Sequence, residues 1–247
     1  EKWRQRYLIE LEQYREIGRR LREILALKSP LVAVSLLNKP GDIPAGVKEL
    51  DRPMFYCVMV KYAMAGNTFY ATERLHECKR GASALGLTEP PEEEITGEFY
   101  FSRDSCSSKM AARRYFEAAP CLRPKSVYAI LLSPLETTPL KPDVIIAETM
   151  PRRALELVQA TIFEKGGKVE SWISAPRQIC SYSTARPYLG SLNVTFACEF
   201  SRNKAKELGL EYLDDGVIIG IPAELLPVIA KNLICIGYIK KRLGGAV

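Results

Sequence analysis

Two stretches of this sequence share one layout: CVMVKYAMAGNTFYATERLHECKRGASALGL at residues 57–87 and CSYSTARPYLGSLNVTFACEFSRNKAKELGL at residues 180–210. Each begins with a cysteine and continues through a helix-like segment, a glycine and a strand-like segment to a second cysteine. A polar helix-like segment and Leu-Gly-Leu then close the stretch. Agreement of order, residue type and spacing is typical of an internal duplication. Chance is the alternative, because Leu-Gly is a common helix end and cysteine is often buried.

Strand-sized apolar runs and helical patterns alternate along the chain. The predicted strands are short and apolar or β-branched, and they lie at 31–37, 68–72, 99–101, 127–132, 144–147, 169–173, 192–196 and 217–221. The predicted helices lie at 2–27, 54–65, 77–85, 105–119, 152–164, 202–208 and 222–243, with 180–188 open between helix and loop. Short strands alternating with helices favour an α/β or α+β fold.

The Pro-rich connector at 133–142 is the predicted boundary between two pseudosymmetric halves. We expect an N-terminal helix at 1–28, a first repeat at 29–136 and a second repeat at 137–247, with the two repeats packed into one compact unit. Equivalent elements would then face each other across a pseudo-twofold axis, where a site could form. The long amphipathic N-terminal helix has two interpretations, which are docking on its own domain and forming a homodimer.

The amino-acid composition limits the cellular compartments and the classes of binding partner that the protein is expected to have. The 247 residues are 47% hydrophobic, which is enough to bury a core without disulfides. The net charge of +6 is spread along the chain and forms no basic cluster interleaved with aromatics, which argues against nucleic-acid binding. No uninterrupted apolar stretch reaches the ~20 residues of a membrane helix. Seven scattered cysteines without a secretion signal predict thiols or metal ligands in a reducing cytoplasm.

Each repeat contributes two cysteines, so four thiols can converge from four places: Cys57, Cys78, Cys180 and Cys198. Four thiolates are the usual protein ligands of an iron–sulfur cluster, with a 4Fe-4S cluster favoured, and they also form closed zinc sites. The spacing lacks the close C-x-x-C pattern that makes such motifs specific. Structural buried thiols are therefore the alternative. The cysteines outside the pattern are interpreted as core or incidental thiols, and they are Cys106, Cys121 and Cys235.

A cluster held by four thiolates carries negative charge, so positive groups or N–H donors should surround it. Arg177 and Arg202 are close in sequence to the cysteines of the second repeat and are the predicted cofactor-binding residues. Other positive side chains near the cysteines are Lys79, Arg80 and Arg186. A cysteine near a helix start also gains thiolate character from the helix dipole.

The only histidine of the chain, His76, stands two residues before Cys78. It is a candidate general base for a cysteine nucleophile or an accessory ligand, and the alternative is an ordinary histidine. No P-loop and no G-x-G-x-x-G fingerprint supports phosphate or dinucleotide binding. The acidic run at 92–94 predicts a solvated loop.

A family resemblance covers most of the chain from about Pro30 onward. It is carried by these residues: Pro30 with the following LVAVSLL, Cys57, Ala63, Gly66, Cys78, Gly81, Leu85-Gly86-Leu87, Pro134-Leu135, Pro151, Gly166-Gly167, Cys180, Cys198, Arg202 and Gly220-Ile221-Pro222. With these features the chain resembles domain-of-unknown-function family 169, found mainly in archaea and anaerobic bacteria. The long N-terminal helix and Ser201 depart from the family pattern. The resemblance implies no established activity, and an anaerobic setting suits an oxygen-sensitive cluster.

The sequence therefore leads to three alternative functions. The first is an iron–sulfur protein with a redox or small-molecule-transforming role, whose partner is a redox protein or a small substrate. The second is a non-metal module that binds a small anion, with the thiols as packing. The third is a thiol enzyme acting through Cys180 or Cys78, with His76 as the base.

Overall fold

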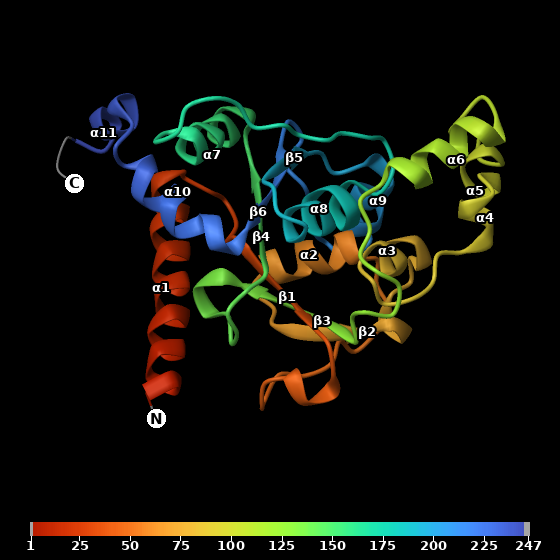
Figure 1. Ribbon diagram of the computed structural model, residues 1–247, viewed down its shortest axis with the longest axis horizontal. Coiled ribbons are helices and arrows are strands. Elements are labelled where there is room, and N and C mark those ends of the chain that lie inside the picture. The colour runs from red at the N-terminus through yellow and green to blue at the C-terminus, as the bar shows by residue number, and fades with distance from the viewer. Residues whose placement is uncertain (1, 245–247) are drawn as a thin grey trace.

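A six-stranded antiparallel sheet forms the centre of the protein, as the computed structural model of Figure 1 shows. The structure describes the backbone of residues 2–244 and the side chains of residues 10–244. The strands are β1 (Val32–Leu37), β2 (Phe69–Thr72), β3 (Ala129–Pro134), β4 (Val144–Thr149), β5 (Asn193–Thr195) and β6 (Val217–Pro222). Their order across the sheet is β2-β3-β1-β4-β6-β5, and with the helices described below they make a mixed α/β fold.

The strand order reads the same outward from the β1–β4 junction in both directions. On one side the first strand is followed by the third and then the second, and on the other side β4 is followed by β6 and then β5. The registers also match, since Val32 pairs with Pro134 and Val144 pairs with Pro222. A 3-10 turn follows each of these prolines, at η3 (Leu135–Thr137) and at η5 (Ala223–Leu225).

The four central strands are buried at every residue, because helices or loops cover both faces of the sheet. Such continuous Val, Ile and Leu runs are typical of parallel strands covered on two sides, and here they occur in antiparallel strands for the same reason. Within β1 the side chains alternate, with Val32 and Val34 in one core and Ala33 in the other. The sheet therefore separates two hydrophobic cores.

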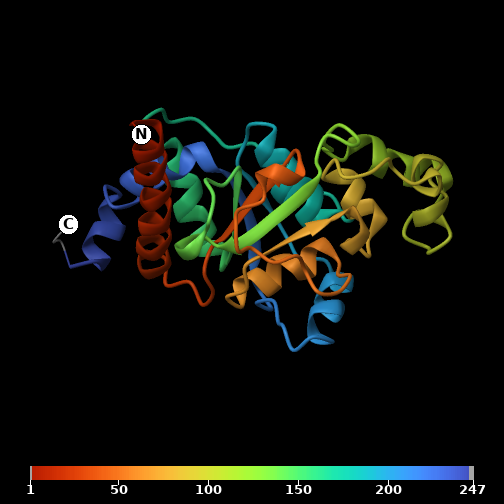
Figure 2. The same ribbon diagram turned by 90° about the horizontal axis from the view of Figure 1, so that it is seen from below.

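One face of the sheet is covered by α1 (Lys2–Ile24), α7 (Pro151–Ile162), α10 (Leu226–Leu233) and α11 (Gly237–Arg242), all seen on the left in Figures 1 and 2. Helix α1 buries Tyr14, Leu21 and Ile24 in the core of this face. The Tyr14 hydroxyl donates a hydrogen bond to the Ala223 carbonyl oxygen at 3.1 Å, so α1 is docked on its own chain. Among residues 2–244, no helix combines the length and apolar character needed to cross a membrane.

The opposite face carries α2 (Tyr56–Met64), a π-helix η4 (Gln178–Ala185) and α8 (Arg186–Tyr188), which in turn contact α3 (Lys79–Ala84) and α9 (Glu199–Lys206). The π-helix lies directly on β6 at Gly220. A Cβ atom on Gly220 would stand 2.2 Å from the Ser183 carbonyl oxygen, so only glycine allows this approach.

A lobe of three short helices projects from this second face, at the right-hand end in both views. It consists of α4 (Glu92–Ile95), α5 (Glu98–Phe101) and α6 (Lys109–Ala118). The prediction of a strand at 99–101 was wrong, because Gly97, at φ 81°, turns the chain into α5. The aromatic side chains then pack within the lobe, where Tyr100 meets Phe99 and Tyr115 edge to face.

Other predicted boundaries are also corrected. Residues 169–173 form no strand, because the Asn193 side-chain amide takes both backbone groups of Trp172, at 2.7 and 3.0 Å. The single helix predicted at 222–243 is the 3-10 turn η5 followed by α10 and α11, and the extended backbone of Ile236 separates α10 from α11. The helix predicted at 105–119 begins later, where Ser108 caps the first turn of α6.

Candidate functional site

The structure brings the four cysteines of the two similar stretches to one cavity. The cavity has a volume of about 500 Å³ and lies among α2, α3, η4, α9 and the projecting lobe. Cys57, Cys78, Cys180 and Cys198 all contribute to its lining. Each is partly buried, and none is in a disulfide. Four thiols from four separate elements therefore line one cavity.

Helix starts position these cysteines. Cys57 is the second residue of α2, and Cys180 is the third residue of the π-helix. Cys78 and Cys198 are the N-cap residues of α3 and α9. The N-terminal end of a helix carries unpaired N–H groups and partial positive charge, so it suits a thiolate.

The two capping cysteines have different hydrogen bonds. The backbone N–H of Gly81 donates to Cys78 Sγ at 3.4 Å. Cys198 Sγ donates to the Ser201 hydroxyl at 3.4 Å, and that hydroxyl donates to the Cys198 carbonyl oxygen at 2.8 Å. Ser201, the residue that departs from the family pattern, thus contacts one of the four thiols directly.

Burial shifts the pKa of two of these thiols, those of Cys57 and Cys180, upward. Burial raises the pKa of Cys57 well above its ordinary value, and the neighbouring thiols of Cys198, Cys180 and Cys78 raise it further. Burial also raises the pKa of Cys180 to about 12, although Arg177 acts in the opposite direction. A cationic metal group would have to displace the thiol protons, so its binding would release protons.

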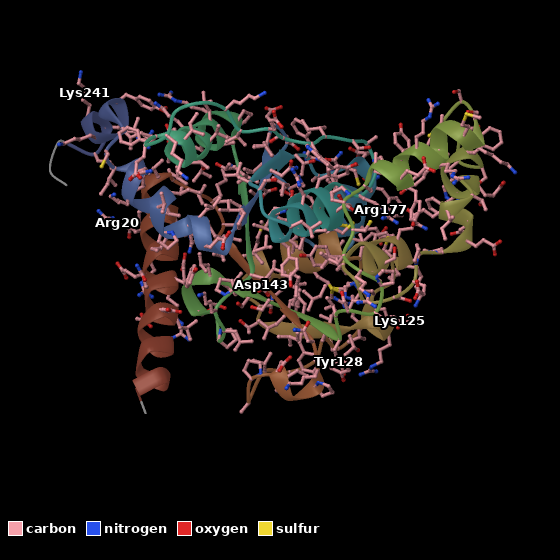
Figure 3. All side chains as sticks on the ribbon, viewed as in Figure 1. Arg20, Lys125, Tyr128, Asp143, Arg177 and Lys241 are labelled. Atoms are coloured by element: carbon pink, nitrogen blue, oxygen red, sulfur yellow. The ribbon has the colours of Figure 1, made fainter. Side chains whose placement is uncertain are left out.

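Arg177 lines the cavity, but its charge is already paired. The guanidinium donates to Glu94 through Nε at 2.8 Å and through Nη2, forming an ion pair that is buried on both sides. It also donates to Cys121 Sγ at 2.9 Å and to the Ser83 hydroxyl at 3.4 Å. Figure 3 shows Arg177 where the central helices meet the lobe. Glu92 and Glu93 are exposed, as the prediction of a solvated acidic loop at 92–94 requires, but the segment is the helix α4 and Glu94 is buried, so the prediction was wrong on those two points.

Arg177 also shapes the segment that carries Cys180. Its backbone is left-handed, at φ 57°, and it forms the N-cap of the π-helix. The Arg177 carbonyl oxygen accepts from the N–H groups of Ser181 at 3.0 Å and Tyr182 at 3.4 Å. The second bond spans five residues, which is the π-helical pattern that recurs at functional sites.

Arg202 is not among the residues that line the cavity. Its guanidinium donates to the carbonyl oxygens of Ala197 at 3.4 Å, Leu213 at 3.1 Å and Asp214 at 3.3 Å. The side chain therefore ties the segment after α9 to the start of that helix, and its support of Cys198 is indirect.

His76 lies behind the cavity wall, where it is 2% exposed. Its ring stacks on Tyr56 with a centroid distance of 6.3 Å. Burial lowers the pKa of His76 to about 4, and the Lys79 charge adds to this effect. The histidine is thus neutral at pH 7 and is held within the core beside Cys78.

Apart from Arg177 and Arg80, sequence reasoning missed the cavity residues that are not cysteines. Phe55 and Phe200 form an aromatic pair with centroids 5.2 Å apart, and both line the cavity. Phe99, with Arg80 and Arg103, lines it from the side of the lobe and α3. The only local signal was that Phe55 and Phe200 each stand two residues from a cysteine. The contribution of the lobe depends on long-range packing that no spacing reveals.

Among the side chains that the structure describes, those of residues 10–244, no three His, Cys, Asp or Glu side chains are arranged to hold a single metal ion.

Comparison with known proteins shows which protein family the chain belongs to. The chain belongs to domain-of-unknown-function family 169 (DUF169), described as Uncharacterised ArCR, whose family model matches residues 20–232. It is similar to the uncharacterized protein MJ0308 of Methanocaldococcus jannaschii, with 32% identity over 228 residues. The alignment covers 91% of this chain and 95% of that protein. No solved structure matches the chain.

Proposed function

We propose that this protein binds an iron–sulfur cluster, of the 4Fe-4S type, and uses it in a redox or small-molecule-transforming reaction. The ligands are the four cysteines Cys57, Cys78, Cys180 and Cys198. The observation that carries the proposal is their arrangement, because residues up to 141 positions apart in the chain line one cavity of about 500 Å³. Four thiolates are the usual ligand set of such clusters.

The surroundings of the cysteines support a negatively charged group. Two of the thiols stand at the N-cap positions of α3 and α9, and Cys57 lies in the first turn of α2. The Gly81 N–H donates to Cys78 Sγ, as backbone donors do to cluster-ligating sulfurs. Arg80 adds a positive charge to the cavity lining. Arg202 supports the site through the backbone next to Cys198, and zinc is the alternative metal.

The proposal includes an internal duplication, with a first repeat at 29–136 and a second at 137–247. The mirrored strand order supports it, since each half contributes three strands in the same relative order. The capping positions of Cys78 and Cys198 support it as well. In this view each half supplies two ligands to a shared cluster, so neither half alone holds it.

The expected setting is the cytoplasm, with a redox protein or a small molecule as the partner. Free thiols at all seven cysteines suit a reducing compartment. Burial of Tyr14 and Leu21 of α1 against the chain itself favours a docked helix over a homodimer formed through that helix.

Anaerobic purification with metal and sulfide analysis tests this function. We expect a brown protein with about four irons and four sulfides per chain, the composition of the cubane. Replacing any one of the four cysteines by serine should remove most of the iron. Cys235→Ser is the matched control, because Cys235 is exposed and lies outside the cavity.

Two results would overturn the proposal. One is a folded, colourless protein that takes up no iron after anaerobic reconstitution with iron and sulfide. The other is iron that is lost equally from Cys235→Ser and from the four cavity variants. If the protein instead contains one zinc ion per chain, and only the four cavity variants lose it, the zinc site is correct and the cluster is not.

A further inference from the structure

A stack of two arginines on one phenylalanine forms part of the cavity wall. Arg80 Cζ lies 3.4 Å from the centroid of the Phe99 ring, and Arg103 Cζ lies 3.8 Å from the same centroid. Two guanidinium groups at these distances cannot share one face of the ring without overlapping. They therefore lie on opposite faces, and all three side chains line the cavity.

These two arginines are far less neutralised than Arg177. Arg80 faces the Glu93 carboxylate at 3.7 Å, and the Glu93 side chain is 52% exposed. Arg103 donates to two neutral oxygens, those of the Phe99 carbonyl at 3.1 Å and of the Ser102 hydroxyl at 3.5 Å. Each guanidinium has five N–H donors, so most of them remain for a ligand. Two like charges beside one ring also repel each other, and a bound anion would relieve that repulsion.

The rest of the cavity wall is mostly apolar. The tilted pair of Phe55 and Phe200 lines it beside the cysteines, and Tyr100 and Tyr115 line it from the lobe. A volume of about 500 Å³ is in the usual range of small-molecule sites, which combine apolar walls with a few polar groups that fix orientation. A ligand that suits this cavity has an acidic group for the arginines and an apolar body for the aromatic wall.

We infer that Arg80 and Arg103 form a subsite for the acidic group of an organic anion with an aromatic or similarly apolar body. The inference names the substrate class of the four-cysteine cavity and rests on the proposed function for its chemistry. The acidic group lies against the two guanidiniums, and the body extends over the aromatic wall toward the thiols. Guanidinium forks are well suited to acidic groups, since they donate two parallel hydrogen bonds.

The experiment compares two fluorescent probes that differ in one acidic group. The anionic probe is 1-anilinonaphthalene-8-sulfonate, and its uncharged analogue is N-phenyl-1-naphthylamine. The protein is the full chain, and the variants are the double change Arg80→Gln with Arg103→Gln and the control Arg113→Gln. Arg113 is on α6 of the same lobe, pairs with Glu117 and does not line the cavity.

The double variant should bind the sulfonate about 10- to 100-fold more weakly than wild type, the loss expected for hydrogen bonds to a charged group. Its affinity for the uncharged probe should stay within about twofold, because the aromatic wall is intact. The control should bind both probes as wild type does, and circular dichroism should show equal folding.

The subsite is overturned if the folded double variant binds the sulfonate as tightly as wild type. Equal loss of both probes would also overturn it, because the arginines would then only shape the wall. Iron is measured in the same samples, which separates this inference from the proposed function. A Cys57→Ser protein without iron that still prefers the sulfonate would support the subsite by itself.

Discussion

The two segments that carry the first cysteine of each half lie on the same face of the sheet but differ in helix type. The Cys57 segment is a regular α-helix, α2, packed on β3, whereas the Cys180 segment is a π-helix packed on β6. The contacts that hold the two segments in place also differ. The carbonyl oxygen of Cys57 accepts from Tyr212 at 2.7 Å, while the π-helix begins at Arg177, which is paired with Glu94 of the lobe. One half thus positions its thiol through the core and the other through the lobe.

Equivalent cysteines of the two halves therefore line one cavity although different structural elements hold them in place. The wider turn of a π-helix spaces the side chains differently from those of an α-helix, and Cys180 lines the cavity from such a turn. This arrangement places Arg177 in the left-handed backbone region and buries its guanidinium, whose charge is neutralised by the Glu94 carboxylate. The second half should therefore respond more strongly than the first to changes in the lobe.

Removing the ion pair between Arg177 and Glu94 of the lobe should change the free energy of unfolding most. Glu94→Ala leaves the Arg177 guanidinium buried without its partner, which should lower the free energy of unfolding by about 3–5 kcal/mol. Urea unfolding at pH 7 measures the loss. Glu117→Ala removes an exposed ion pair of the same lobe and should cost less than about 1 kcal/mol. Equal losses for the two variants would contradict the role of this buried pair.

The residue two positions before the second cysteine gives the next comparison, because it is the buried His76 in one half and the exposed Phe196 in the other. The pKa of His76 is about 4 in the folded chain and about 6.5 when unfolded, so the unfolded chain binds more protons between these values. Stability should therefore fall as pH is lowered from about 6.5 to 4, by up to about 3 kcal/mol.

His76→Phe isolates this contribution, since it keeps a ring against Tyr56 and removes the titration. The difference in unfolding free energy between wild type and the variant should change across this pH window and stay constant above about pH 7.5. Urea unfolding at several pH values measures it. A difference that does not vary with pH would contradict the assignment of the slope to His76.

The smallest expected change in stability comes from the strand residue that lies beneath α2 in one half and beneath the π-helix in the other. Leu132 of β3 and Gly220 of β6 hold matching register positions, opposite Phe69 and Asn193. Gly220→Ala would force the Ser183 backbone away and should cost about 2 kcal/mol, as overpacking does. Gly41→Ala is the control, because a Cβ there meets nothing within 4 Å. Thermal unfolding that shows equal stability for both variants would contradict the close approach of the π-helix.

The sequence predicted the strands of the central sheet well, because their apolar runs are long and carry their own signal. It also predicted that the cysteines of two similar stretches would come together, and the structure places all four at one cavity. Arg177 was predicted there too, but without its partner Glu94. An acidic run beside two prolines has the composition of a surface loop, and the burial of Glu94 within it depends on an arginine 83 residues later.

Other features could not be predicted for similar reasons. The absence of a strand at 169–173 depends on one side-chain amide, that of Asn193, which no local pattern identifies. The π-helix depends on the left-handed backbone of Arg177, a conformation rare for residues other than glycine. The Arg80–Phe99–Arg103 stack joins α3 to the lobe, so its members are separated by helix ends and turns that hide their proximity.

The outermost strands of the sheet, β2 and β5, have only four and three residues. A short edge exposes few unpaired N–H and carbonyl groups, so it is a poor template for strands of neighbouring molecules. The two edges of the sheet should therefore contribute little to strand pairing between molecules.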